Sequence, residues 1–146
     1  MNNLTVKSLP LKEVILNIAE ELETTYEENC NLYTVRIPKK IGTGYIEGID
    51  FGNGFGMLNY HCSFHEKTVI QFTYDQVHPI KFLHCYNGNF VHTFAKSEVL
   101  NEIEKYENTI VGSQYNNGHV LIFEKEVMVG ICSIEIDRAN FIKKIA

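Results

Sequence analysis

The hydrophobic positions of this chain change their spacing near residue 31. Before it, between Pro10 and Leu22, apolar residues recur every three or four positions, as they do on one face of an α-helix. Lysine and glutamate side chains occupy the opposite face, and Pro10 suits a first helical turn. The pattern predicts an amphipathic helix that packs on the outside of a sheet, after a frayed start at residues 1–9. Contact with a second copy is the alternative role for this helix.

After Asn31 the apolar residues fall in short runs separated by turn residues. Even spacing of this kind predicts a β-sandwich or barrel. Residues 96–107 fit either a helical turn or a loop over the rim. A second helix is predicted from Asp137, which serves as its N-cap. The predicted strands are 32–37, 44–51, 56–63, 67–74, 80–86, 89–95, 108–112, 118–124 and 127–136.

Asn87-Gly88 is a strong signal for a two-residue hairpin, because a type I′ turn needs positive φ at both central positions. Such a hairpin pairs His84 with Val91 and places His84 and His92 on opposite faces. Both faces are then apolar or aromatic, with no clear solvent side. We therefore expect a closed or two-layered β architecture.

Composition and charge exclude several classes of function. The net charge is −5, and the basic residues are scattered rather than arranged in the stripe that nucleic acids need. No apolar run is long enough to cross a bilayer, and the start lacks a signal-peptide pattern, so a soluble intracellular protein is expected. The four cysteines form no Cys-x-x-Cys pair and are predicted to be reduced.

Catalytic signatures are weak. His61 and His65 lie about 13 Å apart if their segment is a strand, too far to hold one metal ion together. The sequence has no Gly-x-Ser-x-Gly elbow, and Gly52–Gly56 fits a hairpin turn better than a phosphate loop. Eight tyrosines and nine phenylalanines indicate an aromatic interior. Such an interior is either a small-molecule pocket or an ordinary barrel core.

Several turn and strand segments occur together in this chain. They are Ile37-Pro38, Gly42–Ile49, Tyr60–Phe64, Ile70–Thr73, His78–Leu83, Gly88, and Ser133–Arg138 with Phe141. Over residues 10–146 this set resembles the N-terminal sensor domain of AraC-type transcriptional regulators. The version is the one common in Bacteroidetes, distantly like the pyochelin-responsive regulators.

The resemblance implies a mainly β, cupin-like jelly-roll barrel with an N-terminal amphipathic helix and the start of a C-terminal helix. It implies a helical segment at 1–30, a sensor barrel at 31–136 and the start of a linker helix at 137–146. Such a domain binds an unknown small-molecule effector and forms a homodimer in the cytoplasm, without contact with membranes. DNA is then bound only by a C-terminal helix-turn-helix domain that this chain does not contain.

Cupin enzymes hold a metal with two closely spaced histidines and a glutamate ahead of a glycine, plus a later histidine. If Gly88 is that glycine, Lys81 takes the place of the glutamate, and Asp75 and Val77 take the places of the paired histidines. Only His119 matches the later histidine. A lysine at a ligand position argues against a divalent metal. We therefore expect no metal, no cofactor and no catalytic residue.

The sequence thus predicts a non-enzymatic sensor. The alternatives are a small cupin enzyme with a divalent metal and a purely structural dimerisation module. The residues expected to line the effector pocket are Tyr60, Phe72, His84, Phe94 and His119.

Overall fold

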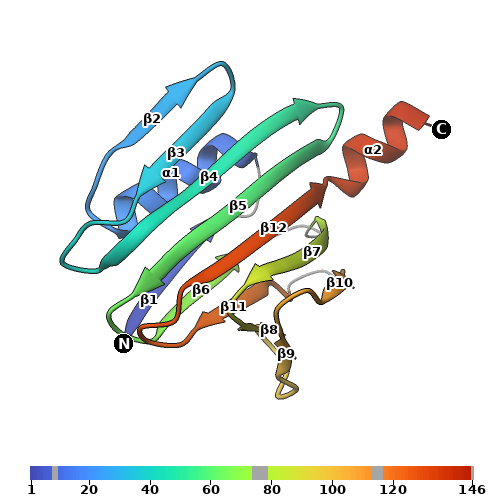
Figure 1. The fold of residues 1–146 in the computed structure, drawn as a ribbon. Coiled ribbons are helices and arrows are strands. Elements are labelled where there is room, and N and C mark those ends of the chain that lie inside the picture. The colour runs from blue at the N-terminus through green and yellow to red at the C-terminus, as the bar shows by residue number, and fades with distance from the viewer. Residues whose placement is uncertain (8–9, 74–78, 113–116, 146) are drawn as a thin grey trace.

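The computed structural model describes residues 1–7, 10–73, 79–112 and 117–145, which form two β-sheets with a helix near each end of the chain (Figure 1). In chain order the elements are β1 (Asn2–Lys7), α1 (Leu11–Glu21), β2 (Tyr26–Asn29), β3 (Leu32–Arg36), β4 (Gly42–Gly52), β5 (Phe55–Phe64), β6 (Thr68–Thr73), β7 (Ile80–Asn87), β8 (Phe90–Phe94), β9 (Asn101–Ile103), β10 (Asn108–Val111), β11 (His119–Phe123), β12 (Val129–Ile136) and α2 (Arg138–Ile145).

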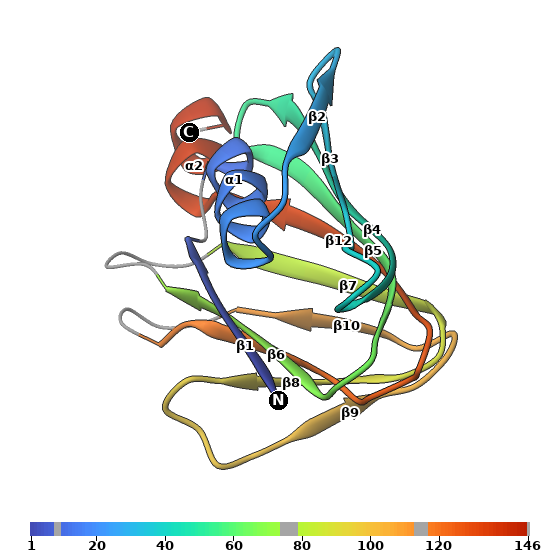
Figure 2. The ribbon, with the colours of Figure 1, turned by 90° about the vertical axis from the view of Figure 1, so that its left-hand side faces the viewer.

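The two sheets face each other across one hydrophobic core (Figure 2). The larger has the strand order β10–β7–β12–β5–β4–β3–β2, and the smaller has the order β1–β6–β11–β8–β9. Strand β5 shows why the sequence folds this way, since its residues alternate between half-buried and buried along its whole length. The mainly β, two-layered architecture is as predicted.

Every predicted strand forms, and three further strands were not predicted. Strand β1 replaces the expected frayed start: it pairs in parallel with β6 and buries Leu4 and Val6 in the core. Its partner strand is more than sixty residues away in the sequence, so no local sequence pattern predicts that β1 is a strand. Strand β2 is largely exposed at a sheet edge, and β9 lies in the segment whose structure was left open.

The sequence predicted that α1 packs on the outside of a sheet, and the structure places it differently. It packs against the core-facing side of the large sheet, between β1 and the β2–β4 edge (Figure 2). Glycines make room for it: a Cβ at Gly56 would lie 1.9 Å from Leu11 Cδ1, and one at Gly48 would lie 3.3 Å from Ile15 Cγ1. The helix therefore fills the wedge between the two sheets rather than covering an outer face.

The predicted hairpin at Asn87-Gly88 is wrong. Strand β7 is bonded to β10 and β12, whereas β8 is bonded to β11 and β9 in the other sheet. Gly88 has a φ of +65°, but Asn87 does not have positive φ and is the last residue of β7, so the predicted type I′ turn does not form and the turn carries the chain from one sheet to the other. A tight turn specifies a change of direction, and which strands then pair depends on partners elsewhere in the chain.

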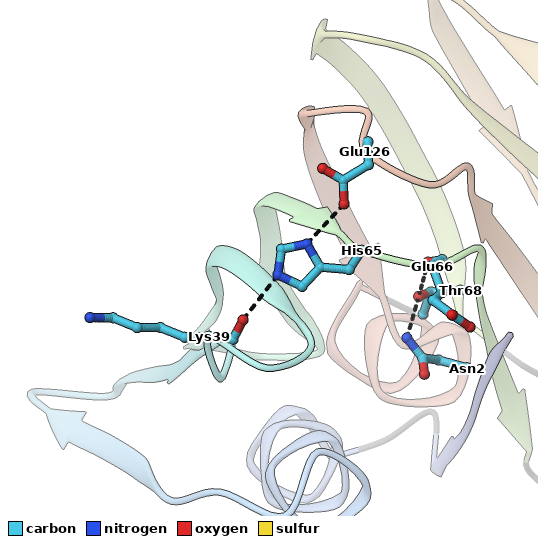
Figure 3. Close-up of polar contacts among 6 residues, drawn as sticks. All are labelled: Asn2, Lys39, His65, Glu66, Thr68 and Glu126. Atoms are coloured by element: carbon cyan, nitrogen blue, oxygen red, sulfur yellow. Dashed lines mark hydrogen bonds and ion pairs between the residues drawn. The ribbon is translucent and has the colours of Figure 1, made fainter.

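His65 connects three turns at one end of the sheets (Figure 3). Its Nδ1 lies 2.8 Å from Glu126 Oε1, between β11 and β12, and its Nε2 lies 3.0 Å from the carbonyl oxygen of Lys39, between β3 and β4. Both partners accept hydrogen bonds, so the arrangement favours a ring with protons on both nitrogens. The bond to Glu126, followed by the bond to the Lys39 carbonyl, raises the pKa of His65.

The predicted C-terminal helix begins as expected. Asp137 Oδ1 accepts a hydrogen bond from the backbone N–H of Asn140, three residues further on. Neither helix of the described structure is long and apolar enough to cross a membrane.

Candidate ligand-binding site

The core between the two sheets contains a group of buried polar side chains. Lys81 on β7, His92 on β8, His119 on β11 and Glu135 on β12 each occupy a core-facing position and are at most 1% exposed. Charged and imidazole side chains are seldom buried so completely without a structural or functional reason.

Lys81 and Glu135 form an ion pair from neighbouring strands. They are direct partners in the β7–β12 register, and Lys81 Nζ is bonded to Glu135 Oε1. The second carboxylate oxygen of Glu135 accepts a hydrogen bond from Ser133 Oγ, two residues earlier on the same face. Lys81 Nζ also lies 4.3 Å from the centre of the Phe72 ring on β6 of the other sheet. The side chain of Lys81 therefore extends across the core from the large sheet to the small one.

Two atoms in this core have unmet hydrogen-bonding capacity. Of the buried side-chain nitrogens and oxygens in the described residues, Tyr60 Oη and His92 Nδ1 have no hydrogen-bond partner. Burial raises the pKa of Tyr60 well above its ordinary value, and the charge of Glu135 raises it further. Tyr60 therefore keeps its hydroxyl proton as a hydrogen-bond donor that the described protein groups leave unused.

The two core histidines form a chain. His92 Nε2 lies 3.0 Å from His119 Nδ1, and His119 Nε2 lies 3.0 Å from the carbonyl oxygen of Pro79. Burial lowers the pKa of His92 to about 4, and the positive charge of Lys81 contributes in the same direction. His92 is thus neutral around pH 7, with Lys81 close enough to influence it.

The structure brings four of the five predicted pocket residues into this region. Tyr60, Phe72 and His119 are buried in the core. Phe94 is half-buried, and its ring centre lies 4.9 Å from that of His92. His84 is placed elsewhere: it lies on the other face of β7, where its Nδ1 contacts Asn108 Oδ1. Strand alternation turns Lys81, rather than His84, toward the core.

Sequence reasoning missed Ser133, Glu135 and His92 as members of this group. A signal was present, because Ser133 and Glu135 occupy alternate positions of a strand that is otherwise apolar. That pattern alone does not say which face turns inward. The register with β7, which sets Glu135 opposite Lys81, is a tertiary result.

The described residues do not fit a divalent metal at the position expected from cupin enzymes. Lys81 points an ammonium group into the core, and the carboxylate beside it is already bonded to both Lys81 and Ser133. No group of three or more potential ligands occurs in the part of the chain that the structure describes. Asp75 and Val77, the positions of the paired histidines, lie outside the described residues.

Two cavities border this polar core. One has a volume of about 350 Å³ and reaches Glu135 from the end where α1, the β4–β5 turn and α2 meet. The other has a volume of about 250 Å³ and reaches His92 from the opposite edges of the sheets, between β9 and β10.

Comparison with known proteins supports the fold and no closer relationship. No family model and no curated protein matches the chain. Among solved structures, the protein described as FeII HppE aligns with 88% of this chain and 77% of its own, at 9% identity and a TM-score of 0.50.

Two other solved structures show a weaker likeness. A cupin 2 conserved barrel domain protein from Salinispora arenicola CNS-205 aligns with 82% of this chain and 87% of its own, at 11% identity and a TM-score of 0.47. An HTH_3 family transcriptional regulator from Vibrio cholerae aligns with 88% and 72%, at 12% identity and a TM-score of 0.46. Its two facing β-sheets and its likeness to FeII HppE show that the chain is a mainly β protein with a cupin-like fold.

Proposed function

We propose that this chain is the effector-binding and dimerisation domain of an AraC-type transcription regulator and is not an enzyme. The observation that carries the sensing role is the pair of unused buried atoms, Tyr60 Oη and His92 Nδ1. Leaving such a group buried and unpaired costs about 1–3 kcal/mol each. A small-molecule effector that forms hydrogen bonds with these two atoms would recover that cost.

The chemistry of the core favours binding over catalysis. The charge of Lys81 is balanced by Glu135, whose second carboxylate oxygen is bonded to Ser133, so this pair is already partnered within the protein. His119 Nε2 lies 3.0 Å from the carbonyl oxygen of Pro79, and His92, the other ring of the pair, is neutral around pH 7. These groups are suited to holding and orienting a ligand by hydrogen bonds.

In this proposal the effector acts by shifting a population of states. It would bind more tightly to one arrangement of the core and of α2, which begins at Arg138, three residues after Glu135. DNA would be bound by a C-terminal helix-turn-helix domain outside these 146 residues, and the protein would work in the cytoplasm.

A thermal-shift screen tests the sensing role. The purified chain is titrated with a panel of small polar and aromatic metabolites, alongside Tyr60→Phe and the control Tyr45→Phe, whose residue lies half-buried beside His61. An effector should raise the melting temperature of the wild type and of the control, and raise that of Tyr60→Phe less. A wide panel that leaves the wild type unchanged would refute the sensing role.

The outer face of the large sheet supports the dimerisation role. Six apolar residues lie next to one another in register across six strands, from β10 to β3. Ile110 is 65% exposed and Phe82 is 38% exposed, and the other four are half-buried. This apolar row consists of Ile110, Phe82, Ile134, Met57, Ile49 and Leu32.

A second copy of the chain fits this face by area. Seven strands about 4.8 Å apart and on average about seven residues long at about 3.3 Å each present roughly 780 Å². A stable interface buries about 800 Å² on each partner, so one face of this size is sufficient. A second row of apolar residues, Ile80, Ile136 and Phe55, extends the patch in the direction of α2.

Sedimentation equilibrium tests the dimer. The wild type should be a dimer at micromolar concentration, and Ile134→Glu, at the centre of the apolar row, should be a monomer. Gln71→Glu places the same side chain at a half-buried position of the small sheet and should leave the dimer intact. A monomeric wild type, or a dimeric Ile134→Glu, would contradict this assignment.

A further inference from the structure

The cavity between β9 and β10 lies where the edges of the two sheets meet. Strand β9 ends the small sheet, β10 ends the large one, and the turn between them joins the two edges. The cavity has a volume of about 250 Å³, with residues of both strands along its sides and His92 among its lining residues. His92 is 0% exposed, so its ring forms part of the inner wall of the cavity and is shielded from solvent in the free protein.

The hydrogen bonds of the two histidines determine what His92 offers to this cavity. The carbonyl of Pro79 only accepts, so His119 Nε2 carries the proton of that bond. When the His119 ring is neutral, its Nδ1 is then an acceptor and His92 Nε2 donates to it. His92 is neutral around pH 7, so its Nδ1 is left as a bare acceptor, and it is one of the unpartnered buried atoms.

The rim of the cavity also consists of acceptors. Glu102 and Glu107 both line it. Glu102 accepts a hydrogen bond from Asn89 Nδ2 at 3.1 Å, and Glu107 accepts one from the backbone N–H of Glu104 at 2.9 Å, which leaves each carboxylate capacity for more. No lysine or arginine is among the described lining residues. A negatively charged ligand would meet two carboxylates there and an imidazole lone pair below.

We propose that this cavity binds a small ligand that presents N–H or O–H donors and carries no negative charge, with one donor bonded to His92 Nδ1. Amides, amidines and hydroxylated compounds belong to this class. The inference rests on the proposed sensing function, because it assigns a chemical class to the effector. The volume sets the size, since about 250 Å³ is below the range of drug-sized sites.

Three compounds of nearly equal shape test the class: benzamide is neutral with N–H donors, benzamidine is a cation with N–H donors, and benzoate is an anion without donors. Binding is followed by the ring ¹⁵N resonances of His92 in the wild-type chain. Benzamide and benzamidine should move the unprotonated Nδ1 resonance toward a hydrogen-bonded value, and benzoate should not. Binding of benzoate at this ring, or no shift with any of the three, would overturn the proposal.

Two variants and one control sharpen the test. His92→Phe keeps the ring and removes the acceptor, and it should weaken benzamide binding about tenfold. Glu102→Gln, at an exposed rim position, should weaken benzamidine a few-fold and leave benzamide unchanged, and it tests the rim should His92→Phe fail to fold. His61→Phe removes a histidine on the outer face of β5, so it should alter the binding of neither compound. If Glu102→Gln lowers the affinity for both compounds equally, the charge at the rim does not have the proposed role.

The outcomes separate this inference from the proposed function. A metabolite that stabilises the wild type through Tyr60 while leaving the His92 resonances unchanged would refute the cavity and retain the sensor. Binding of the amide at His92, combined with a metabolite panel that has no effect, would retain the cavity and refute the sensor.

Discussion

Lys81 and Glu135 lie directly opposite each other on β7 and β12, and each is only 1% exposed. A buried ion pair contributes little net stability, because both charges lose their hydration, but loss of one partner leaves the other uncompensated. The pair therefore makes the two positions interdependent.

Removing one charge of this pair should be far worse than removing both. We expect Lys81→Met to lower the free energy of unfolding by about 3–5 kcal/mol, and the double variant Lys81→Met/Glu135→Leu to recover most of that loss. Urea denaturation measures both. Lys67→Met, which breaks the exposed pair with Glu124, should change the midpoint little. A double variant as unstable as the single one would contradict the interpretation.

The hydroxyl group of Tyr60 should cost the free protein stability. Tyr60→Phe removes an unpartnered buried oxygen, so we expect the free energy of unfolding to stay the same or to rise by about 1 kcal/mol. Tyr86→Phe is the matched comparison, because that hydroxyl donates to Asn59 Oδ1 at 2.9 Å, and its loss should cost about 1 kcal/mol. If Tyr60→Phe is the more destabilising of the two in urea denaturation, the Tyr60 hydroxyl has a partner.

His92 should make the protein less stable in acid. Its pKa is about 4 in the folded state and about 6.5 when unfolded, so the unfolded chain binds more protons between these values. Stability is therefore complete above about pH 6.5 and falls as the pH drops toward 4, by up to roughly 3 kcal/mol. The His92→Gln variant should show a flatter dependence in urea titrations across this range. Parallel curves for variant and wild type would contradict a neutral His92.

His65 should have the opposite dependence. Its pKa is raised by Glu126, so its contribution is complete below the unfolded value of about 6.5 and is lost as the pH rises through the folded value. A proton NMR titration should place the midpoint of His65 above that of an unfolded histidine. In Glu126→Gln the midpoint should return toward the ordinary value, whereas Glu124→Gln, a change at another exposed carboxylate, should leave it in place.

Two glycines with positive φ separate backbone strain from steric contact. At Gly52 (φ +79°) a new Cβ would meet no atom within 4 Å, so Gly52→Ala should cost only the left-handed conformation, about 1–2 kcal/mol. At Gly88 (φ +65°) it would lie 2.2 Å from the carbonyl oxygen of Met128, so Gly88→Ala should be clearly more destabilising. If urea denaturation shows an equal loss of stability in the two variants, the turn at Gly88 rearranges to accommodate the added methyl group.

The site could be predicted from the sequence only in part, and the reason is strand register. The aromatic content of the β region identified Tyr60, Phe72 and Phe94 as candidates for the interior. Alternation separated His84 from His92 but could not say which of the two faces inward. Glu135 joined the site only because the β7–β12 register sets it opposite Lys81, and registers between distant strands depend on the whole sheet.

Local patterns determined much of this protein. The change from helical to alternating spacing near residue 31, the turns rich in glycine and asparagine, and the Asp137 cap predicted α1, the central strands and α2, because each depends on neighbours along the chain. Tertiary structure alone decided the parallel pairing of β1 with β6, the passage of Asn87-Gly88 between sheets, and the meeting of Lys81, Glu135, Tyr60 and His92 in one core. These features join residues tens of positions apart, and their energy comes from burial and pairing that exist only once both sheets have formed.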